Sequence, residues 1–301
     1  MEKKLSLTVT STILLLLNAC GVAVVPGSGK IVKETRDVSN YSQVVFSAPG
    51  ELTIQQNGYE GLVIEADDNL LGYIRTRVQG NVLYIYEEPD IIHLYPSKPI
   101  RYTLDVTALT YVTLNGSGVI RSNELIASNL DFDLNGSGDI MVAAVKSQST
   151  TLDLDGSGEY RLGSFITGQF ALSLDGSGDI TMQEVVAKTA DLSIDGSGKL
   201  VMADVIADTL RMRIDGSGDS TLSGEVKHQA ITIHGSGSYD AGNLQSQVTT
   251  AKVIGSGDSR VWVTDELDIT ITGSGDIIYR GEPALTQTVT GSGNVASLVR
   301  Q

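Results

Sequence analysis

The sequence predicts an all-β protein, a parallel β-helix (β-solenoid) of about 20 residues per rung with an irregular N-terminal β cap. Two observations predict this class. The triplet Gly-Ser-Gly returns ten times at spacings of 18 to 20 residues, and aliphatic residues keep a fixed register to it. The first glycines of these triplets are Gly116, Gly136, Gly156, Gly176, Gly196, Gly216, Gly235, Gly255, Gly273 and Gly291. A period held this closely indicates one structural rung per repeat.

Each rung alternates apolar and polar residues on both sides of its triplet. The position two residues before the first glycine is aliphatic in all ten copies. The position four before it is apolar in nine of ten, with Gln287 as the exception. Alternation resumes after the triplet, as in Ile140 and Val142, and another apolar residue follows three positions later, as in Val145. We therefore expect three short strands per rung, separated by corners, with equivalent strands stacked in parallel about 4.8 Å apart.

The triplet itself is predicted to be a corner of the rung. Glycine accepts a positive φ and leaves no side chain to crowd the next rung. The residue before the triplet changes along the chain, from Asn115 through several aspartates to His234, Ile254 and Thr290. Because the corner is constant and this neighbouring column varies, we expect function in the column rather than in the triplet.

The N-terminus is organised like an export signal. Two lysines precede an uncharged run from Leu5 to Leu17, which is too short to span a bilayer. The segment 17–20 resembles the lipobox of bacterial lipoproteins, which implies cleavage before Cys20 and attachment of lipid to that residue. Cys20 is the only cysteine, so a disulfide within the chain is impossible. The next residue is Gly21 rather than Asp, and by resemblance to lipoprotein sorting this favours the outer membrane or cell surface.

These patterns predict that the chain is divided into four parts. Residues 1–19 are the expected signal peptide, and residues 20–30, rich in Gly and Ser, are the expected tether. Residues 31–111 are irregular but rich in strand patterns, and are expected to form an N-terminal β cap with a degenerate first rung. Within them, residues 44–54 repeat the order of apolar strand, small-residue turn, acid and strand. Residues 112–301 are the expected β-helix repeats.

This order of features resembles the head GIN domain family, which carries an auto-transporter adhesin label. The resemblance rests on the lipobox, the degenerate rung, the Gly-Ser-Gly-Asp rungs and the segment Ile64–Leu71 (IEADDNLL), whose second half should form a turn or short helix. It covers residues 31–300. The resemblance implies an envelope-attached β-helix and brings no catalytic residues with it.

Acidic side chains are expected to form two columns beside the triplets. The first column holds Asp155, Asp175, Asp195 and Asp215, stacked about 5 Å apart. The second column lies just past the triplets and is broken by Lys199; it holds Asp139, Glu159, Asp179 and Asp219. Stacked carboxylates repel one another, and a hard cation such as Ca²⁺ would relieve this repulsion. We expect solvated ladders, with a weak Ca²⁺ site on these four aspartates as the alternative and no other cofactor.

The amino-acid composition disfavours several classes of function. A net charge of −15, from 21 Lys and Arg against 36 Asp and Glu, disfavours nucleic-acid binding. Three histidines and one cysteine offer no zinc cluster. The sequence therefore predicts a non-enzymatic, exported lipoprotein, anchored to the membrane through Cys20, that binds a cell-surface glycan or protein through the β-helix surface. A polysaccharide-active lyase or hydrolase is the alternative, because Arg211 and Arg213 lie beside Asp215.

Overall fold

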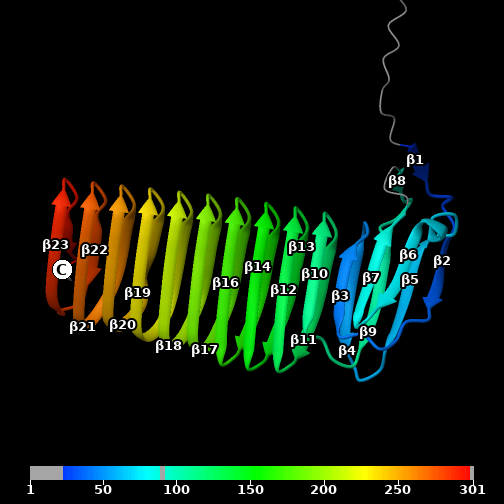
Figure 1. Ribbon diagram of the computed structural model, residues 1–301, viewed down its shortest axis with the longest axis horizontal. Helices are drawn as coiled ribbons and strands as arrows, with labels where there is room; N and C mark the ends of the chain where they lie inside the picture. Colours follow the sequence, from blue (N-terminus) through cyan, green and yellow to red (C-terminus); the bar gives the residue numbers. More distant parts are fainter. Residues whose placement is uncertain (1–22, 89–91, 299–301) are drawn as a thin grey trace, which may run out of the picture.

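The computed structural model describes residues 23–88 and 92–298, which form a rod of stacked β rungs with an irregular head at one end (Figure 1). Cys20 and the signal peptide lie outside the described residues. The all-β, parallel solenoid architecture predicted from the triplets is confirmed. None of the helices among the described residues is long and apolar enough to cross a membrane.

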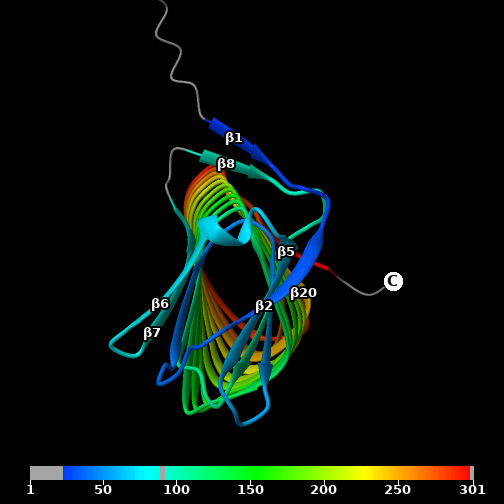
Figure 2. The same ribbon diagram turned by 90° about the vertical axis from the view of Figure 1, so that its right-hand side faces the viewer.

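The strands of the solenoid alternate between the two sides of the triplet corners from β10 to β16, and from β17 to β21 one long strand runs from each triplet to the next. They are β10 (Tyr111–Gly116), β11 (Val119–Ile126), β12 (Asn129–Gly136), β13 (Asp139–Lys146), β14 (Ser149–Gly156), β15 (Glu159–Ile166), β16 (Gln169–Gly176), β17 (Asp179–Gly196), β18 (Lys199–Gly216), β19 (Asp219–Gly235), β20 (Ser238–Gly255), β21 (Asp258–Gly273), β22 (Ile277–Arg280), β23 (Ala284–Gly291) and β24 (Val295–Ser297). Viewed along the rod, the rungs lie one behind another around a shared interior (Figure 2).

Each rung contains three β segments that pair in parallel with the neighbouring rungs. Strand β11 pairs with β13 on both sides of Asn123 but not at that residue. The long strand β17 pairs with β18 on both sides of Lys188 but not there. These two gaps and the triplet mark three corners, which confirms the prediction of three short strands per rung.

The aliphatic columns predicted from the sequence fill the interior of the rod. Leu114, Leu134 and Leu174, each two residues before a triplet, are fully buried, and the equivalent residues continue along the axis. Aromatic residues enter the same core, where the ring centroids of Phe132 and Phe165 lie 6.4 Å apart. Burial of these columns against their copies in adjacent rungs supplies the main stabilisation of the rod.

The triplets turn a corner in the way that their composition predicts. The first glycine has a positive φ in all ten copies; at Gly156 it is 130°. A Cβ atom added to Gly156 would lie 2.4 Å from the carbonyl oxygen of Gly136 in the previous rung. The amide of Ser157 donates to that same oxygen at 2.9 Å, so the corner continues the hydrogen-bond ladder.

The head places its strands in an order that differs from their order in the chain. Its elements are β1 (Ala23–Pro26), β2 (Ile31–Arg36), β3 (Gln43–Ser47), β4 (Glu51–Gln56), β5 (Gly61–Asp67), the 3-10 turn η1 (Leu71–Tyr73), β6 (Ile74–Gln79), β7 (Val82–Glu87), β8 (Ile92–Tyr95) and β9 (Arg101–Val106). Strands β3 and β4 form a rung between β10–β11 on one side and β7–β9 on the other. Antiparallel strands β6, β5 and β2 then cover the outer end.

Part of the expected tether forms a strand and a turn that contacts with the head fix in place. Residues 23–26 form β1, which pairs in parallel with β8, and a turn follows. The carboxylate of Asp67, fully buried, accepts hydrogen bonds from the amide of Gly29 at 2.7 Å and from the amide and hydroxyl of Ser97 at 2.8 and 2.6 Å. Glycine and serine suggested a flexible linker by composition, but residues distant in the sequence fix the segment from Ala23 onwards.

The other end of the rod leaves its interior open among the described residues. Every residue of β23 is exposed, including Leu285 at 38% and Val289 at 40%, although both occupy inward-facing columns. Their counterparts one rung earlier, Leu267 and Ile271, are buried.

Candidate functional site

A groove runs along the outward side of the segments that lead into the triplets, a surface that we call the first face. Its volume is 460 Å³. The groove is lined by Thr151, Asp153, Ala171, Leu172, Ser173, Asp191, Leu192, Ser193, Arg211, Met212, Arg213, Ala230 and Thr232. These residues come from five consecutive rungs in parallel register, so the groove follows the axis of the rod.

Small side chains form part of the floor of the groove, and charged side chains lie before and after them in one column. Ala171, Ser173 and Ser193 occupy neighbouring positions, with the hydroxyl of Ser193 donating to that of Ser173 at 3.3 Å. Asp153 lies one rung before Ser173, and Arg213 lies one rung after Ser193. This column therefore offers two hydroxyls between a carboxylate and a guanidinium, and Asp191 lies beside them in the neighbouring column.

Asp153 lies in an acidic environment. Partial burial raises the pKa of its carboxyl group above the ordinary value, and the nearby carboxylates of Asp133, Asp131 and Asp175 raise it further. A carboxyl group accepts hydrogen bonds from hydroxyl groups whether or not it is ionised, and the neighbouring carboxylates disfavour an anionic ligand beside it. This end of the groove suits a neutral, hydroxyl-rich ligand.

The two arginines predicted from the sequence lie in the fourth of the five rungs that line the groove, and both make ion pairs. Arg211 binds Asp191 at 3.0 Å, and Arg213 binds Asp215 at 2.5 Å. Asp215 also lies 2.7 Å from Nδ1 of His234, one rung further. Desolvation raises the pKa of Asp215, but hydrogen bonds from His234 and Arg213 outweigh it and lower the pKa overall. Arg213, Asp215 and His234 form the cluster on which the enzymatic alternative depends.

The predicted aspartate column is formed as expected from the register. Asp155, Asp175, Asp195 and Asp215 are successive partners along the ladder. Asparagines continue the column toward the head, where Asn135 donates to the side-chain oxygen of Asn115 at 3.2 Å. Across the described ranges, no group of three or more His, Cys, Asp or Glu is arranged to hold a metal ion. The Ca²⁺ alternative remains a prediction.

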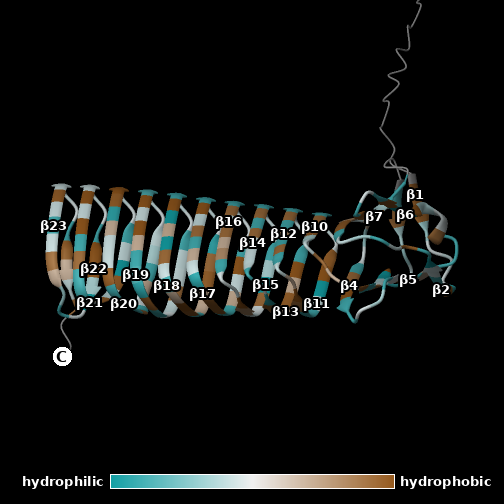
Figure 3. Cartoon of the chain, turned by 60° about the horizontal axis from the view of Figure 1, so that its bottom comes forward, coloured by the Kyte–Doolittle hydropathy of each residue, from teal (hydrophilic) through white to brown (hydrophobic). Residues whose placement is uncertain are grey.

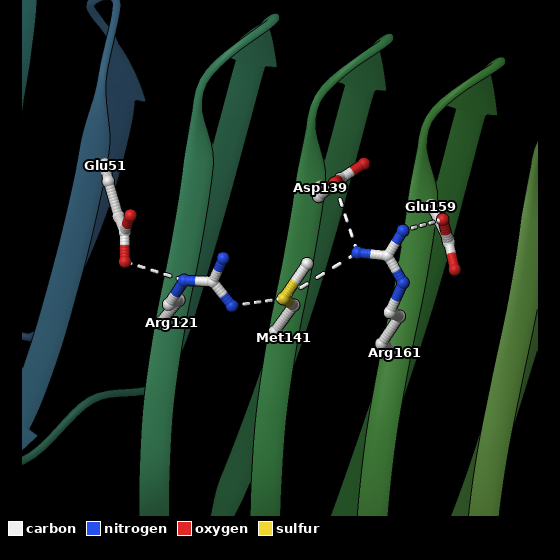
Figure 4. Close-up of polar contacts among 6 residues, drawn as sticks. All are labelled: Glu51, Arg121, Asp139, Met141, Glu159 and Arg161. Carbon is white, nitrogen blue, oxygen red and sulfur yellow. Dashed lines mark hydrogen bonds and ion pairs between the residues drawn. The ribbon is translucent and has the colours of Figure 1, made fainter. Parts of the chain in front are cut away.

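A second polar band follows the triplets on the adjoining side of the rod (Figure 4). Arg121 binds Glu51 of the head at 2.6 Å, and Arg161 binds both Asp139, at 3.3 Å, and Glu159. Met141 lies between the two arginines and contacts both. Arginines therefore neutralise this second acidic column in the rungs nearest the head. The sequence pattern did not reveal the pairs with Glu51 and Asp139, because these partners are 70 and 22 residues away.

Further along the rod, carboxylates of the second column serve the backbone. The side chain of Asp258 accepts the amide of Asp276 at 2.9 Å, and Asp276 accepts the amide of Asn294 at 2.9 Å. These carboxylates extend the ladder where rungs shorten to 18 residues. They are structural groups rather than free ligands for a cation.

Comparison with known proteins gives the fold and the family. No curated protein matches the chain. Among solved structures, a "putative adhesin" from Parabacteroides merdae is 21% identical with a TM-score of 0.53, covering 92% of this chain and 100% of its own. A "putative lipid binding protein" from Parabacteroides distasonis has the same identity, TM-score and coverage. A "putative adhesin" from the same species is 22% identical with a TM-score of 0.52, covering 91% of this chain and 100% of its own.

Family membership is shown by the sequence itself. The family described as "Putative auto-transporter adhesin, head GIN domain" matches residues 40–204 and again residues 170–283, which together span most of the chain. The second match begins inside the first, as expected when one rung pattern repeats. The resemblance inferred from the repeats and the segment Ile64–Leu71 is thereby confirmed, and the chain belongs to the head GIN domain family.

Proposed function

We propose that this protein is an adhesin-like, non-enzymatic lipoprotein that binds a hydroxyl-rich glycan or a protein at a cell surface. The groove on the first face is the observation that carries the proposal. It provides a floor of small hydroxyl side chains between Asp153 and Arg213, and a ligand extended along the rod axis can contact several rungs in succession. The adhesin labels of the family and of its solved relatives support the same role.

We propose a lipid anchor on Cys20 from the sequence, and this residue is close to the head along the chain. Cys20 is three residues before Ala23, the first residue of β1, so a chain of this length spans at most about 10 Å. A lipid on Cys20 would therefore hold the head close to the membrane, while the rod extends away from the anchored end (Figure 1). We propose the outer membrane or the cell surface as the location, and mass spectrometry of the mature N-terminus tests the lipid.

Ligand binding is proposed to need both Asp153 and Arg213. Carboxylates and arginines make strong, directed hydrogen bonds to sugar hydroxyls and acidic groups, and the serines of the floor add weaker ones. Because Arg211 and Arg213 already have carboxylate partners, a ligand must offer acceptors that replace or share those contacts. This requirement favours glycans that carry acidic groups, or acidic segments of a protein.

The experiment that tests the proposal is a glycan array, with whole-cell pull-down, on the purified chain, together with an assay for cleavage of the captured glycan. Saturable binding without turnover is the expected result. Turnover that Arg213→Ala abolishes would contradict the non-enzymatic role and would favour the polysaccharide-active alternative, which depends on the cluster of Arg213, Asp215 and His234.

A further inference from the structure

We infer that two copies of this chain join end to end, through antiparallel pairing of β23 with the same strand of the second copy. Strand β23 is the outermost strand of the rod, at the end away from the head (Figure 1). Figure 3 shows this end from another side, with β23 again last in the row of rungs. Among the described residues, the ladder that includes β23 joins it to β21 of the preceding rung, and its outer edge is open to a further strand.

The main-chain groups at this open edge belong to Leu285, Gln287 and Val289. The amide of Ser292 donates to the carbonyl oxygen of Gly273 in the preceding rung at 2.9 Å. Because successive residues of a strand point their main-chain groups toward opposite edges, the even-numbered residues of β23 face β21 and the odd-numbered residues face outward along the axis. The side chains of the same three residues occupy inward-facing columns and are exposed at the end of the rod.

A second copy of β23 complements these three residues in one register. In an antiparallel pair centred on Gln287, that residue lies opposite its own copy, and Leu285 lies opposite Val289 of the second copy. The amides and carbonyls of all three residues then form hydrogen bonds, and the aliphatic side chains meet in the interior. Any other centre on the strand leaves Leu285 or Val289 without an aliphatic neighbour.

Gln287 is the one polar residue in its column, and the pairing gives it a role. The equivalent residue is apolar in the nine other rungs. A primary amide is both a donor and an acceptor of hydrogen bonds, so two Gln287 side chains that meet on a two-fold axis can bind each other. The polar side chain is then satisfied inside a continuous core.

The pairing keeps the interior of the rod continuous from one copy to the next. The two-fold axis is perpendicular to the first face, so residues that face inward in one copy face inward in the second as well. The paired strands lie about 4.8 Å apart, which is the spacing of the rungs themselves. The two rods point in opposite directions with their heads at the far ends. The inference therefore depends neither on the ligand of the first face nor on the anchor.

The distribution of charge selects the β23 end of the second copy rather than its head. Each strand from β11 to β22 carries at least one charged side chain, whereas β23 and β24 carry none. Two chains with a net charge of −15 therefore meet at this end with the least repulsion. In the head, the edge strand β2 carries Lys33, Glu34 and Arg36, and the edge strand β6 carries Arg75 and Arg77. Charged side chains protect sheet edges from pairing, so the head does not complement β23.

Disulfide crosslinking tests the contact, its direction and its register. In the centred pair, Thr286 lies opposite Thr288 of the second copy on the outward side, with Cα atoms about 4.5 Å apart. We would mix full-length Thr286→Cys chains with Thr288→Cys chains, both carrying Cys20→Ser, and oxidise with copper phenanthroline. The mixture should form a linked heterodimer. Each variant alone should link poorly, because its cysteine does not lie opposite its own copy.

The control is a mixture of Asp268→Cys and Thr270→Cys chains, which carry cysteine at the equivalent outward positions one rung earlier. Strand β21 is already paired on both edges, so this mixture should not link efficiently. A Thr286→Cys and Thr288→Cys heterodimer no more abundant than the control would contradict the inference. Efficient linkage of either single variant to its own copy indicates another register or a parallel pair and would also contradict it.

Sedimentation equilibrium of the Cys20→Ser chain gives an independent measure. We expect a reversible dimer. Thr286→Lys with Thr288→Lys should raise the dimer Kd about tenfold, because lysine then faces lysine across the pair. The matched control, Thr270→Lys with Thr272→Lys in β21, should leave the Kd unchanged. Mixing the lysine variant with a Thr286→Glu, Thr288→Glu variant should restore association, since each lysine then faces a glutamate.

Two results of this measurement would overturn the inference. One is a parent chain that stays monomeric at about 100 µM, where even a Kd of that order would leave a detectable dimer. The other is a folded Thr286→Lys, Thr288→Lys variant that dimerises as tightly as the parent chain, because a dimer of that kind forms through another surface.

Discussion

The backbone of Gly156 lies directly over that of Gly136, and no side chain fits between them. A Cβ atom on Gly156 would lie 2.4 Å from the carbonyl oxygen of Gly136, and its φ of 130° is unfavourable for any other residue. The same relationship recurs at the triplets that follow along the rod. The Gly-Ser-Gly triplet therefore exists because rungs must stack closely at a corner, and it does not form a reactive loop.

Replacing a corner glycine should destabilise the rod. Gly156→Ala combines backbone strain with a clash against the previous rung, so we expect the free energy of unfolding to fall by about 2–4 kcal/mol. Thermal and denaturant unfolding followed by circular dichroism measure this change. Gly72→Ala is the control, because its Cβ would have no neighbour within 4 Å and its φ lies outside the left-handed range. Equal effects of the two substitutions would refute the stacking explanation.

The buried carboxylate of Asp67 should hold the N-terminal turn in place. Asp67→Ala removes the acceptor of the Gly29 and Ser97 amides, so hydrogen exchange at those amides should become faster. The exposed Asp265→Ala serves as the control and should leave exchange unchanged. If Gly29 keeps its protection in Asp67→Ala, the turn is held by other contacts.

Acid should loosen the same turn. The hydrogen bonds from Ser97, first through its hydroxyl, and from Gly29 lower the pKa of Asp67 below its ordinary value of 3.8. A lowered pKa means that the carboxylate stabilises the fold fully above pH 3.8, and that this contribution is lost as the pH falls through the folded-state pKa. Exchange at the Gly29 amide, corrected for its intrinsic pH dependence, should therefore accelerate below pH 3.8. In Asp67→Ala the acid-induced change should disappear.

Removing one charge from the aspartate column should stabilise the rod. Asp175 lies between Asp155 and Asp195, so Asp175→Asn relieves repulsion and permits an amide contact like that of Asn135 with Asn115. We expect a gain of roughly 0.2–1 kcal/mol, read as a higher Tm. Added NaCl should raise the Tm of the parent chain, and Ca²⁺ at matched ionic strength should add nothing further. A larger rise with Ca²⁺, abolished by Asp175→Asn, would establish the cation site instead.

The repeats were predictable because their physics is local and periodic. The alternating residues on both sides of each glycine corner define the rung, and the register of Leu114 with Leu134 follows from the period. The aspartate column was predictable for the same reason. The sequence repeats the triplet and its aliphatic neighbours ten times, so one irregular copy such as Gln287 does not obscure the pattern.

Features that depend on contacts between distant or irregular segments were not predictable. Asp67 holds Gly29 across 38 residues, so composition alone suggested a tether. In the head, β7 and β9 pair with β3 and β4 on the side away from the solenoid, although they come later in the chain. Ile126, Ile166 and Ile206 recur every 40 residues, but only the structure shows that these residues face outward.

The central claim, that the groove of the first face binds the ligand, is tested most directly by filling the groove. Ser193→Trp places a large side chain on the groove floor, while Thr270→Trp makes the same change in the same column outside the groove. The measurement is the Kd for the glycan or protein captured by the parent chain. We predict at least about a tenfold weaker Kd for Ser193→Trp and an unchanged Kd for Thr270→Trp, with both rods folded. Unchanged affinity in a folded Ser193→Trp chain would contradict the account.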